Sequence, residues 1–100
     1  MRVLVVAKPR GIVPPDQIPG LIDVALQWYE RYQDRFEAFG TFPAGGGFAA
    51  VDVADEAALH RLILEMPFSP FSDVTVTPYV AGDTGFRQAQ EAFAAMAGSR

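Results

Sequence analysis

Three acid or base side chains in this 100-residue chain are candidates for proton transfer: Glu30, Asp52 and His60. Taking a proton from a carbon beside a carbonyl needs a base whose pKa lies near the working pH, and burial raises the pKa of a carboxyl group toward that range. His60 is the only histidine, and its ordinary pKa already lies there. These three residues are the predicted catalytic set.

Each of the three also has a structural explanation that the sequence leaves open. Glu30 can be a solvated helix carboxylate that interacts with its neighbour Arg31. Asp52 can bond at a strand end or across a subunit interface. His60 stands at the border of an apolar helical stripe, where packing or hydrogen bonding accounts for it equally well.

Five residues are predicted to bind a substrate. Lys8 and Arg10 follow the first apolar segment and can anchor an anionic group. Tyr29 and Tyr32 place two hydroxyls on one helical stripe, where one of them can stabilise an oxyanion. Phe48 adds apolar contact. The alternative is that the two cations are solvated and the aromatic rings belong to the core.

Composition excludes several classes of function. The net charge is −4 and no cluster of basic residues is present, so the sequence predicts no nucleic-acid partner. Without cysteine there are no disulfides, thiolate ligands or cysteine nucleophile, and one histidine cannot make a His-rich site, so we expect no metal. Glycines 45–47 are not followed by the Lys-Ser/Thr of a phosphate loop.

Hydropathy predicts a soluble, cytoplasmic protein without a membrane partner. No apolar run approaches the ~18 residues of a membrane span. The apolar opening 1–7 is too short for the core of a signal peptide, and Lys8-Pro9-Arg10 interrupts it.

Hydrophobic periodicity and turn residues predict four strands and three helices. The expected strands are 3–7, 41–43, 48–53 and 73–77, with glycines 45–47 in the hairpin between the second and the third. The first helix is expected to begin after Asp16 and to end near Phe39, with Gly40 as its C-cap. Asp55 caps the second helix and Pro67 ends it. Asp83 or Thr84 caps the third.

This order predicts an α+β domain with the ferredoxin-like βαββαβ plan and an extra C-terminal helix. Right-handed crossovers place the first two helices on one face of a four-stranded antiparallel sheet, within a domain formed by residues 1–80. The valine-rich face, with Val51 and Val53, suits those helices. The opposite face is mixed, so a second copy is expected to cover it, and helix 81–100 is expected to pack on that partner.

Four segments of the sequence resemble the muconolactone isomerase family. They are Gly40-Thr41, Val51-Asp52-Val53, Ala58-Leu59-His60 and the proline-rich joint from Met66 to Val76. The resemblance implies a dimeric α/β barrel that can assemble further into a decamer. It also implies a cofactor-independent isomerase that shifts a proton within an unsaturated lactone.

The chain departs from that family at a pair of residues linked with its active site. The family carries Lys-x-x-Glu on its first helix, and the matching positions here are Leu26 and Tyr29. The favoured function is a cofactor-free isomerase, or a related lyase or cyclase, acting on a hydrophobic molecule with a carbonyl. A noncatalytic small-molecule-binding or assembly module is the alternative, and a cofactor-free oxygenase is a third possibility.

Overall fold

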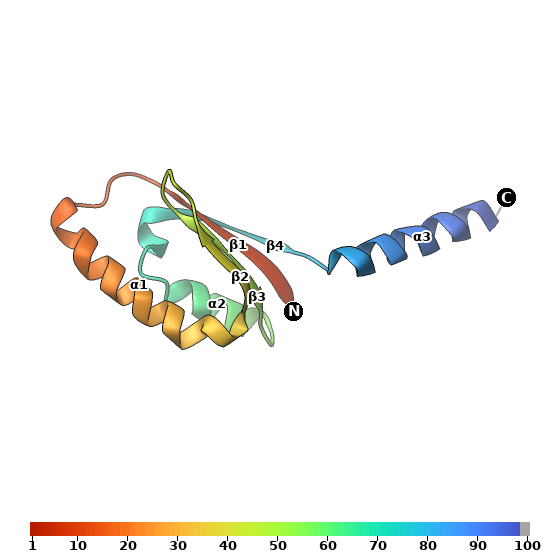
Figure 1. Ribbon diagram of the computed structural model, residues 1–100, viewed down its shortest axis with the longest axis horizontal. Coiled ribbons are helices and arrows are strands. Elements are labelled where there is room, and N and C mark those ends of the chain that lie inside the picture. Colours follow the sequence, from red (N-terminus) through yellow and green to blue (C-terminus); the bar gives the residue numbers. More distant parts are fainter. Residues whose placement is uncertain (99–100) are drawn as a thin grey trace.

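A central four-stranded antiparallel sheet with strand order β2-β3-β1-β4 organises the computed structural model, which describes residues 1–98 (Figure 1). The strands are β1 (Arg2–Pro9), β2 (Phe36–Thr41), β3 (Gly47–Asp52) and β4 (Ser72–Pro78). The helices are α1 (Ile18–Tyr32), α2 (Glu56–Leu64) and α3 (Gly82–Gly98). Short 3-10 turns occupy Pro15–Gln17, Gln33–Arg35 and Ser69–Phe71. The ferredoxin-like α+β prediction is confirmed.

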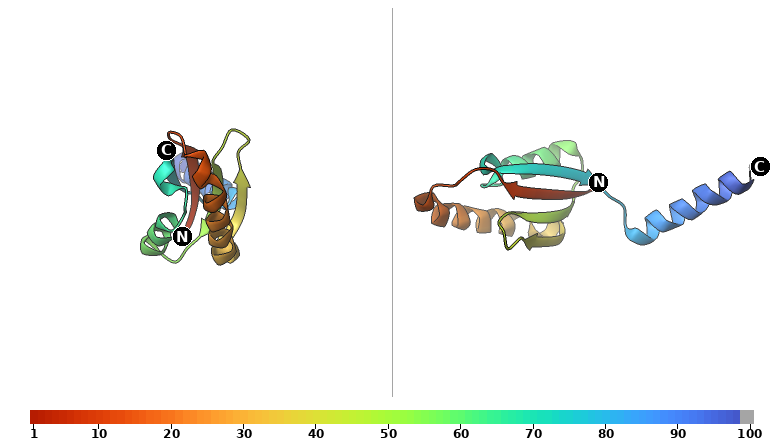
Figure 2. Two further views of the ribbon diagram at one scale, coloured as in Figure 1. Left: turned by 90° about the vertical axis from the view of Figure 1, so that its left-hand side faces the viewer. Right: turned by 90° about the horizontal axis from the view of Figure 1, so that it is seen from above.

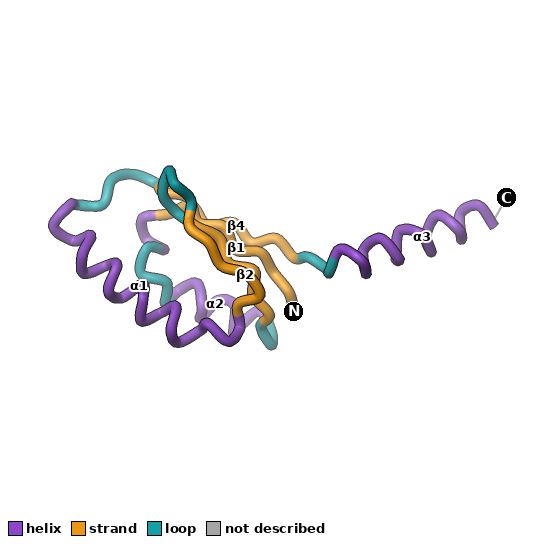
Figure 3. The backbone as a smooth tube through the Cα atoms, in the orientation of Figure 1, coloured by secondary structure: helices purple, strands orange, loops and turns teal. Residues whose placement is uncertain are grey.

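β1 is apolar on both sides because it is a central strand. Val5 pairs with Ala49 of β3 on one side and with Val76 of β4 on the other. Helices α1 and α2 lie together on one face of the sheet, which we call the covered face (Figure 3). Successive side chains of a strand point to opposite faces, so Val3 and Val5 point to the helices, whereas Leu4 and Val6 point to the uncovered face.

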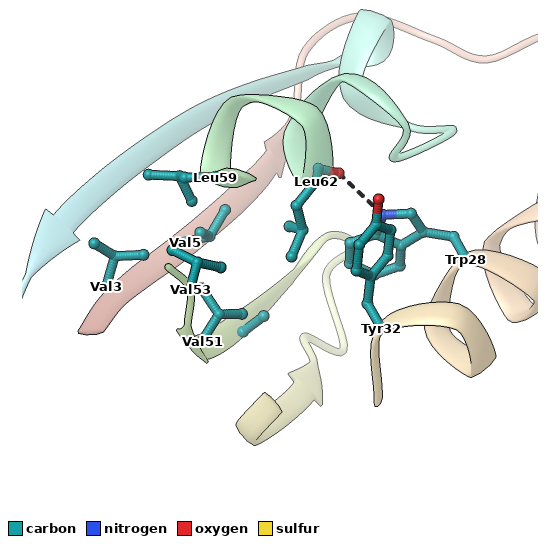
Figure 4. Close-up of a cluster of buried hydrophobic side chains, with 9 residues drawn as sticks. Val3, Val5, Trp28, Tyr32, Val51, Val53, Leu59 and Leu62 are labelled. Carbon is teal, nitrogen blue, oxygen red and sulfur yellow. Dashed lines mark hydrogen bonds between the residues drawn. The ribbon is translucent and has the colours of Figure 1, made fainter. Parts of the chain in front are cut away.

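One hydrophobic core lies between the covered face and the two helices (Figure 4). The sheet contributes Val3, Val5, Ala49 and Val51, joined by Val53 just after β3; α1 contributes Trp28 and Tyr32, and α2 contributes Leu59 and Leu62. Burying each of the larger aliphatic side chains stabilises the fold by roughly 1.5–3 kcal/mol. The predicted assignment of the valine-rich face to the helices is therefore confirmed.

The predicted boundary between the first helix and the second strand was wrong. α1 ends at Tyr32, and the segment from Phe36 to Thr41 is a strand paired with β3. Gly40 lies within this strand, where a Cβ would collide with the Phe48 ring, so its role is close packing and not a helix C-cap. Aromatic residues continue the helical spacing, but pairing with β3 outweighs that local pattern.

The buried stripe of α1 also differs from the predicted one. Helical spacing puts Ile22 on the same stripe as Tyr29 and Tyr32, yet 55% of its surface is exposed. Trp28 and Tyr32 are the buried residues of the helix. The true stripe is set by how α1 lies across the sheet and against α2, which periodicity within one helix cannot fix.

The second helix follows the sequence signals closely. The Asp55 carboxylate accepts a hydrogen bond from the Ala58 amide at 2.9 Å, as an N-cap residue should. The helix ends at Leu64, three residues before Pro67. In the joint that follows, the amide of Phe71 donates to the carbonyl of Phe68 at 2.9 Å, and both rings are partly buried.

α3 projects away from the sheet as a separate arm (Figures 1 and 2). The principal extents of the chain are 65 × 25 × 21 Å. Helix α3 begins at Gly82, so Asp83 and Thr84 are first-turn residues and not the predicted caps. The end of the predicted segment, residues 99 and 100, lies outside the described residues. Within residues 1–98, no helix has the length and hydropathy needed to cross a membrane.

Candidate ligand-binding cavity

A cavity of about 360 Å³ lies between the covered face of the sheet and the two helices. Its walls come from Val5 and Ala7 of β1, Ala49 of β3, Ala25 and Trp28 of α1, and Leu62 of α2. The small side chains explain why space remains: alanine is the residue at three of these six positions, where a larger side chain would fill the gap between helix and sheet.

Trp28 joins the two helices at the inner part of the cavity (Figure 4). Its indole N–H donates to the backbone carbonyl of Leu62 at 3.0 Å, so the one polar atom of the ring is satisfied within the core. Its ring contacts Phe36 and Phe39 of β2, with centroids 5.4 and 6.3 Å away. The indole therefore holds α1, α2 and the edge strand in a fixed relation around the cavity.

The glycine hairpin forms the outer end of the cavity beside the last residues of β1. Gly45 and Gly46 have φ of 101° and 80°, a region that glycine enters without steric cost. A Cβ at Gly46 would collide with the carbonyl oxygen of Ala7. Glycine at this position lets the hairpin pack directly on the backbone of β1.

The cavity lining contains no ionisable side chain. Apart from the indole of Trp28, its polar side chains are the hydroxyls of Thr41 and Ser72. Among the hydrogen bonds within residues 1–98, neither hydroxyl is engaged. The site can therefore bind apolar groups and offer two free hydroxyls, but its own walls supply no general acid or base.

The three predicted catalytic residues do not line this cavity. Glu30 on α1 and His60 on α2 are exposed. Asp52, at the end of β3, pairs with the N-terminal ammonium of Met1 at 3.3 Å, and its side chain is 55% exposed. The structure does not bring the three together within one chain, and their catalytic role stays a prediction.

Of the predicted substrate-binding residues, Phe48 is the one that contributes to the lining. Its ring packs against Phe42 with centroids 5.9 Å apart. Tyr29 lies in the aromatic cluster beside the cavity, 5.0 Å from Phe39 between ring centroids. Lys8 is exposed. Arg10 lies 3.6 Å from the carboxylate of Asp73, and its guanidinium donates to a backbone carbonyl of the proline-rich joint.

Tyr32 connects α1 to the end of α2. Its hydroxyl donates to the carboxylate of Glu65, which also pairs with Arg31 at 3.2 Å. Burial, followed by the bond to Glu65, raises the pKa of Tyr32. The hydrogen bond from Tyr32 lowers the pKa of Glu65, and Arg31 adds to that effect. This arrangement holds the helices together on the outside of the cavity.

Sequence reasoning missed several lining residues. Ser72 and Phe71 were assigned to a joint between elements, and Thr41 to the beginning of a strand that in fact ends there. The position of Thr41 was hidden by the wrong helix boundary. A strand assignment for residues 36–41 would have placed its side chain on the same face as Phe39.

The described part of the chain offers no preformed metal centre. Within residues 1–98, no group of three or more His, Cys, Asp or Glu side chains lies close enough together to hold a metal ion. The cavity has no such ligand in its lining.

No protein-family model matches this sequence, and a search of curated proteins finds no match. Solved structures are similar in fold. A muconolactone isomerase shares 19% sequence identity, with a TM-score of 0.71 over 81% of this chain and 90% of the other. A 5-chloro-2-hydroxyhydroquinone dehydrochlorinase from Burkholderia phenoliruptrix AC1100, in complex with 2,5-dihydroxybenzoquinone, shares 17% identity, with a TM-score of 0.67 over 84% and 98%.

These similarities define the fold of the chain. The sheet with its two covering helices is the one found in muconolactone isomerase, as the four sequence segments indicated. At such identities the likeness says nothing about a particular reaction or substrate.

Proposed function

We propose that this protein binds a hydrophobic small molecule in the cavity between the sheet and the helices. The observation that carries the proposal is the cavity itself: about 360 Å³, with apolar walls and two free hydroxyls. Ligand sites in proteins are concave, mostly apolar and roughly 300–1,000 Å³ in volume, with a few polar groups that orient the ligand. The similar dehydrochlorinase, whose structure holds a small ring compound, supports a ligand of this size.

The reaction we propose is a cofactor-independent isomerisation, or a related elimination or cyclisation, beside a carbonyl of the bound molecule. The two similar structures support it because both belong to enzymes that act on small molecules, an isomerase and a dehydrochlorinase. The reaction needs a base, and the cavity walls contain none. Glu30, Asp52 or His60 could serve only if a second chain carries one of them to the cavity.

A homodimer, able to assemble further into a decamer, is part of this proposal. The uncovered face carries half-buried Leu4, Val6 and Ala50, and no element of the same chain covers these residues in the described structure (Figure 3). Phe86 and Phe93 on α3 are 76% and 69% exposed. Apposed sheets and a clasping α3 would remove this apolar surface from water. Sedimentation at micromolar concentration tests the proposal, and a stable monomer would contradict it.

A noncatalytic binding module is the second candidate, and the absence of an ionisable residue from the lining favours it. Binding and catalysis can be separated experimentally. Trp28 is the only tryptophan of the chain and lines the cavity, so its fluorescence reports occupancy. Ligands found in this way are then incubated with the protein and analysed for products.

Matched variants test whether the cavity is the binding site and whether the candidate acids and base take part in turnover. Ala25→Leu fills the cavity and should abolish binding, whereas Ala57→Leu adds the same atoms at an exposed position of α2 and should leave binding unchanged. If turnover is found, it should fall in one of Glu30→Gln, Asp52→Asn or His60→Gln. Turnover that survives all three would end the proposed catalytic role of these residues. Binding without turnover would support the module.

A further inference from the structure

We infer that the ligand of this cavity is uncharged: a ring-sized hydrophobic molecule with a hydroxyl, carbonyl or ester group at one end and no carboxylate. The inference rests on the proposed function and narrows its substrate class. A cavity that binds a substrate with an acidic group needs a cation in its walls, and the walls of this cavity contain none.

The first argument is the absence of any charge in the walls. Every lining residue is neutral at pH 7, and an isolated carboxylate moved from water into such surroundings loses its hydration without gaining a partner. Two cations, Lys8 and Arg10, lie at the same end of the sheet, but neither supplies the partner that a carboxylate in the cavity would need. Lys8 is exposed and points to the uncovered face by strand alternation, since its neighbours Ala7 and Pro9 line the cavity. The guanidinium of Arg10 forms an ion pair with Asp73 at 3.6 Å and donates to the backbone carbonyl of Pro70 at 3.4 Å.

The second argument is where the free hydroxyls lie along the strands. Phe39, Ala49 and Val5 form one cross-strand row of the sheet at the inner part of the cavity. The next row outward on the same face contains Thr41, Gly47 and Ala7. Ser72 pairs with Pro9 one row further out. The polar groups therefore lie at the outer end.

The ligand orientation follows from this gradient. The apolar ring should lie against Trp28, Leu62 and Ala49, and the single polar group should point outward to a hydroxyl. Thr41 and Ser72 lie on opposite edge strands, so three strand spacings, about 14 Å, separate them across the sheet, and Ser72 is also one row further out. A ring-sized molecule consequently bonds to one of them and not to both.

Three matched probes test the charge requirement: 4-tert-butylcyclohexanol, 4-tert-butylcyclohexanecarboxylate and the methyl ester of the latter. Saturated rings do not absorb where tryptophan is excited, so the fluorescence of Trp28 can be titrated directly. The alcohol and the ester should bind, and the carboxylate should bind at least about 100-fold more weakly at pH 7. Thr41→Val or Ser72→Ala should weaken binding of the alcohol about 5- to 10-fold.

The outcomes distinguish this inference from the function on which it rests. Ala25→Leu, or Val13→Phe in the loop before α1 should the first variant fail to fold, must abolish binding of every probe, and Ala57→Leu must not. Equal binding of carboxylate and ester, lost in the filled variant, would overturn the inference and leave the cavity as the site. If none of the probes binds, the proposed function itself is overturned.

Discussion

The two faces of the sheet differ in what the same strands place on them. On the covered face, Val3, Val5 and Val51 are almost fully buried in the core, and Val5 also lines the cavity. On the uncovered face, the neighbouring residues Arg2 and Asp52 are charged and exposed. The fully buried apolar side chains of the strands thus lie on the covered face, whereas the uncovered face combines half-buried Leu4 and Val6 with charged groups.

A polar network crosses one end of the sheet. Arg2 Nε lies 3.0 Å from Glu37 Oε1, and the hydroxyl of Tyr79 donates to the same carboxylate at 2.8 Å. This bond raises the pKa of Tyr79. A register irregularity between Phe36 and Ala38 allows Glu37 to reach these partners. The comparison shows that the residues most suggestive of acid/base chemistry lie away from the cavity.

The largest effect should come from placing the same polar residue on each face in turn. Val51→Asn buries an amide without partners and removes core contacts, so the free energy of unfolding should fall by about 4 kcal/mol. Asp52→Asn, one residue further on, loses only an exposed ion pair and should change it by less than about 0.5 kcal/mol. Urea unfolding measures both. Similar losses would refute the assignment of the two faces.

A second test compares two leucines of α2. Leu62 is 1% exposed and lines the cavity, whereas Leu64 is 66% exposed. Leu62→Ala should lower the free energy of unfolding by about 3 kcal/mol, and Leu64→Ala by less than about 0.5 kcal/mol. A large loss in Leu64→Ala at concentrations where the chain associates would instead reveal that Leu64 is buried in an assembly.

The glycine hairpin gives a third test. Gly46→Ala combines a positive φ with a collision against the backbone of β1, and should cost about 2 kcal/mol. In α1, Gly20 has open space around its position, so Gly20→Ala should stabilise the helix by roughly 0.5–1 kcal/mol. Thermal unfolding of the two variants measures both changes in stability. A neutral Gly46→Ala would show that the hairpin does not pack on β1.

The smallest effect concerns the pH dependence of stability. The folded-state pKa of Glu65 is lowered, first by the hydrogen bond from Tyr32. Ionised Glu65 therefore adds to the free energy of unfolding above its unfolded-state pKa of ~4.3, and this stabilisation is lost as the pH falls through its folded-state pKa. In Tyr32→Phe the decline of stability below that pH should become shallower. An unchanged acid profile would mean that the bond does not persist in solution.

The sequence predicted the fold well because its signals are local and repeated. Strand alternation around Val51 and Val53, the Asp55 cap and the end of α2 before Pro67 each depend on residues close in the chain. The boundary between α1 and β2 failed for the opposite reason. Residues 33–39 suit a helix by spacing, and only pairing with β3, together with aromatic contacts to Trp28, makes Phe36–Thr41 a strand.

The candidate site was predictable only in part. Of the five residues that the sequence suggested for substrate binding, Phe48 lies in the lining of the cavity. Thr41, Ser72 and Leu62 come from three different elements, and no spacing in the sequence connects them. The roles of Thr41 and Ser72 depend on which face β2 and β4 turn to the helices, and thus on a strand register that the sequence does not state. The role of Leu62 depends on how α2 lies on the sheet.

The sequence by itself determined the order of strands and helices and the valine-rich face that the helices cover, because these follow from local preference and composition. The tertiary structure alone decided that the ionisable candidates lie outside the cavity and that two hydroxyls lie at its outer end. The physical reason is that a cavity is what remains when distant segments pack imperfectly, so its walls are fixed by long-range register and helix placement.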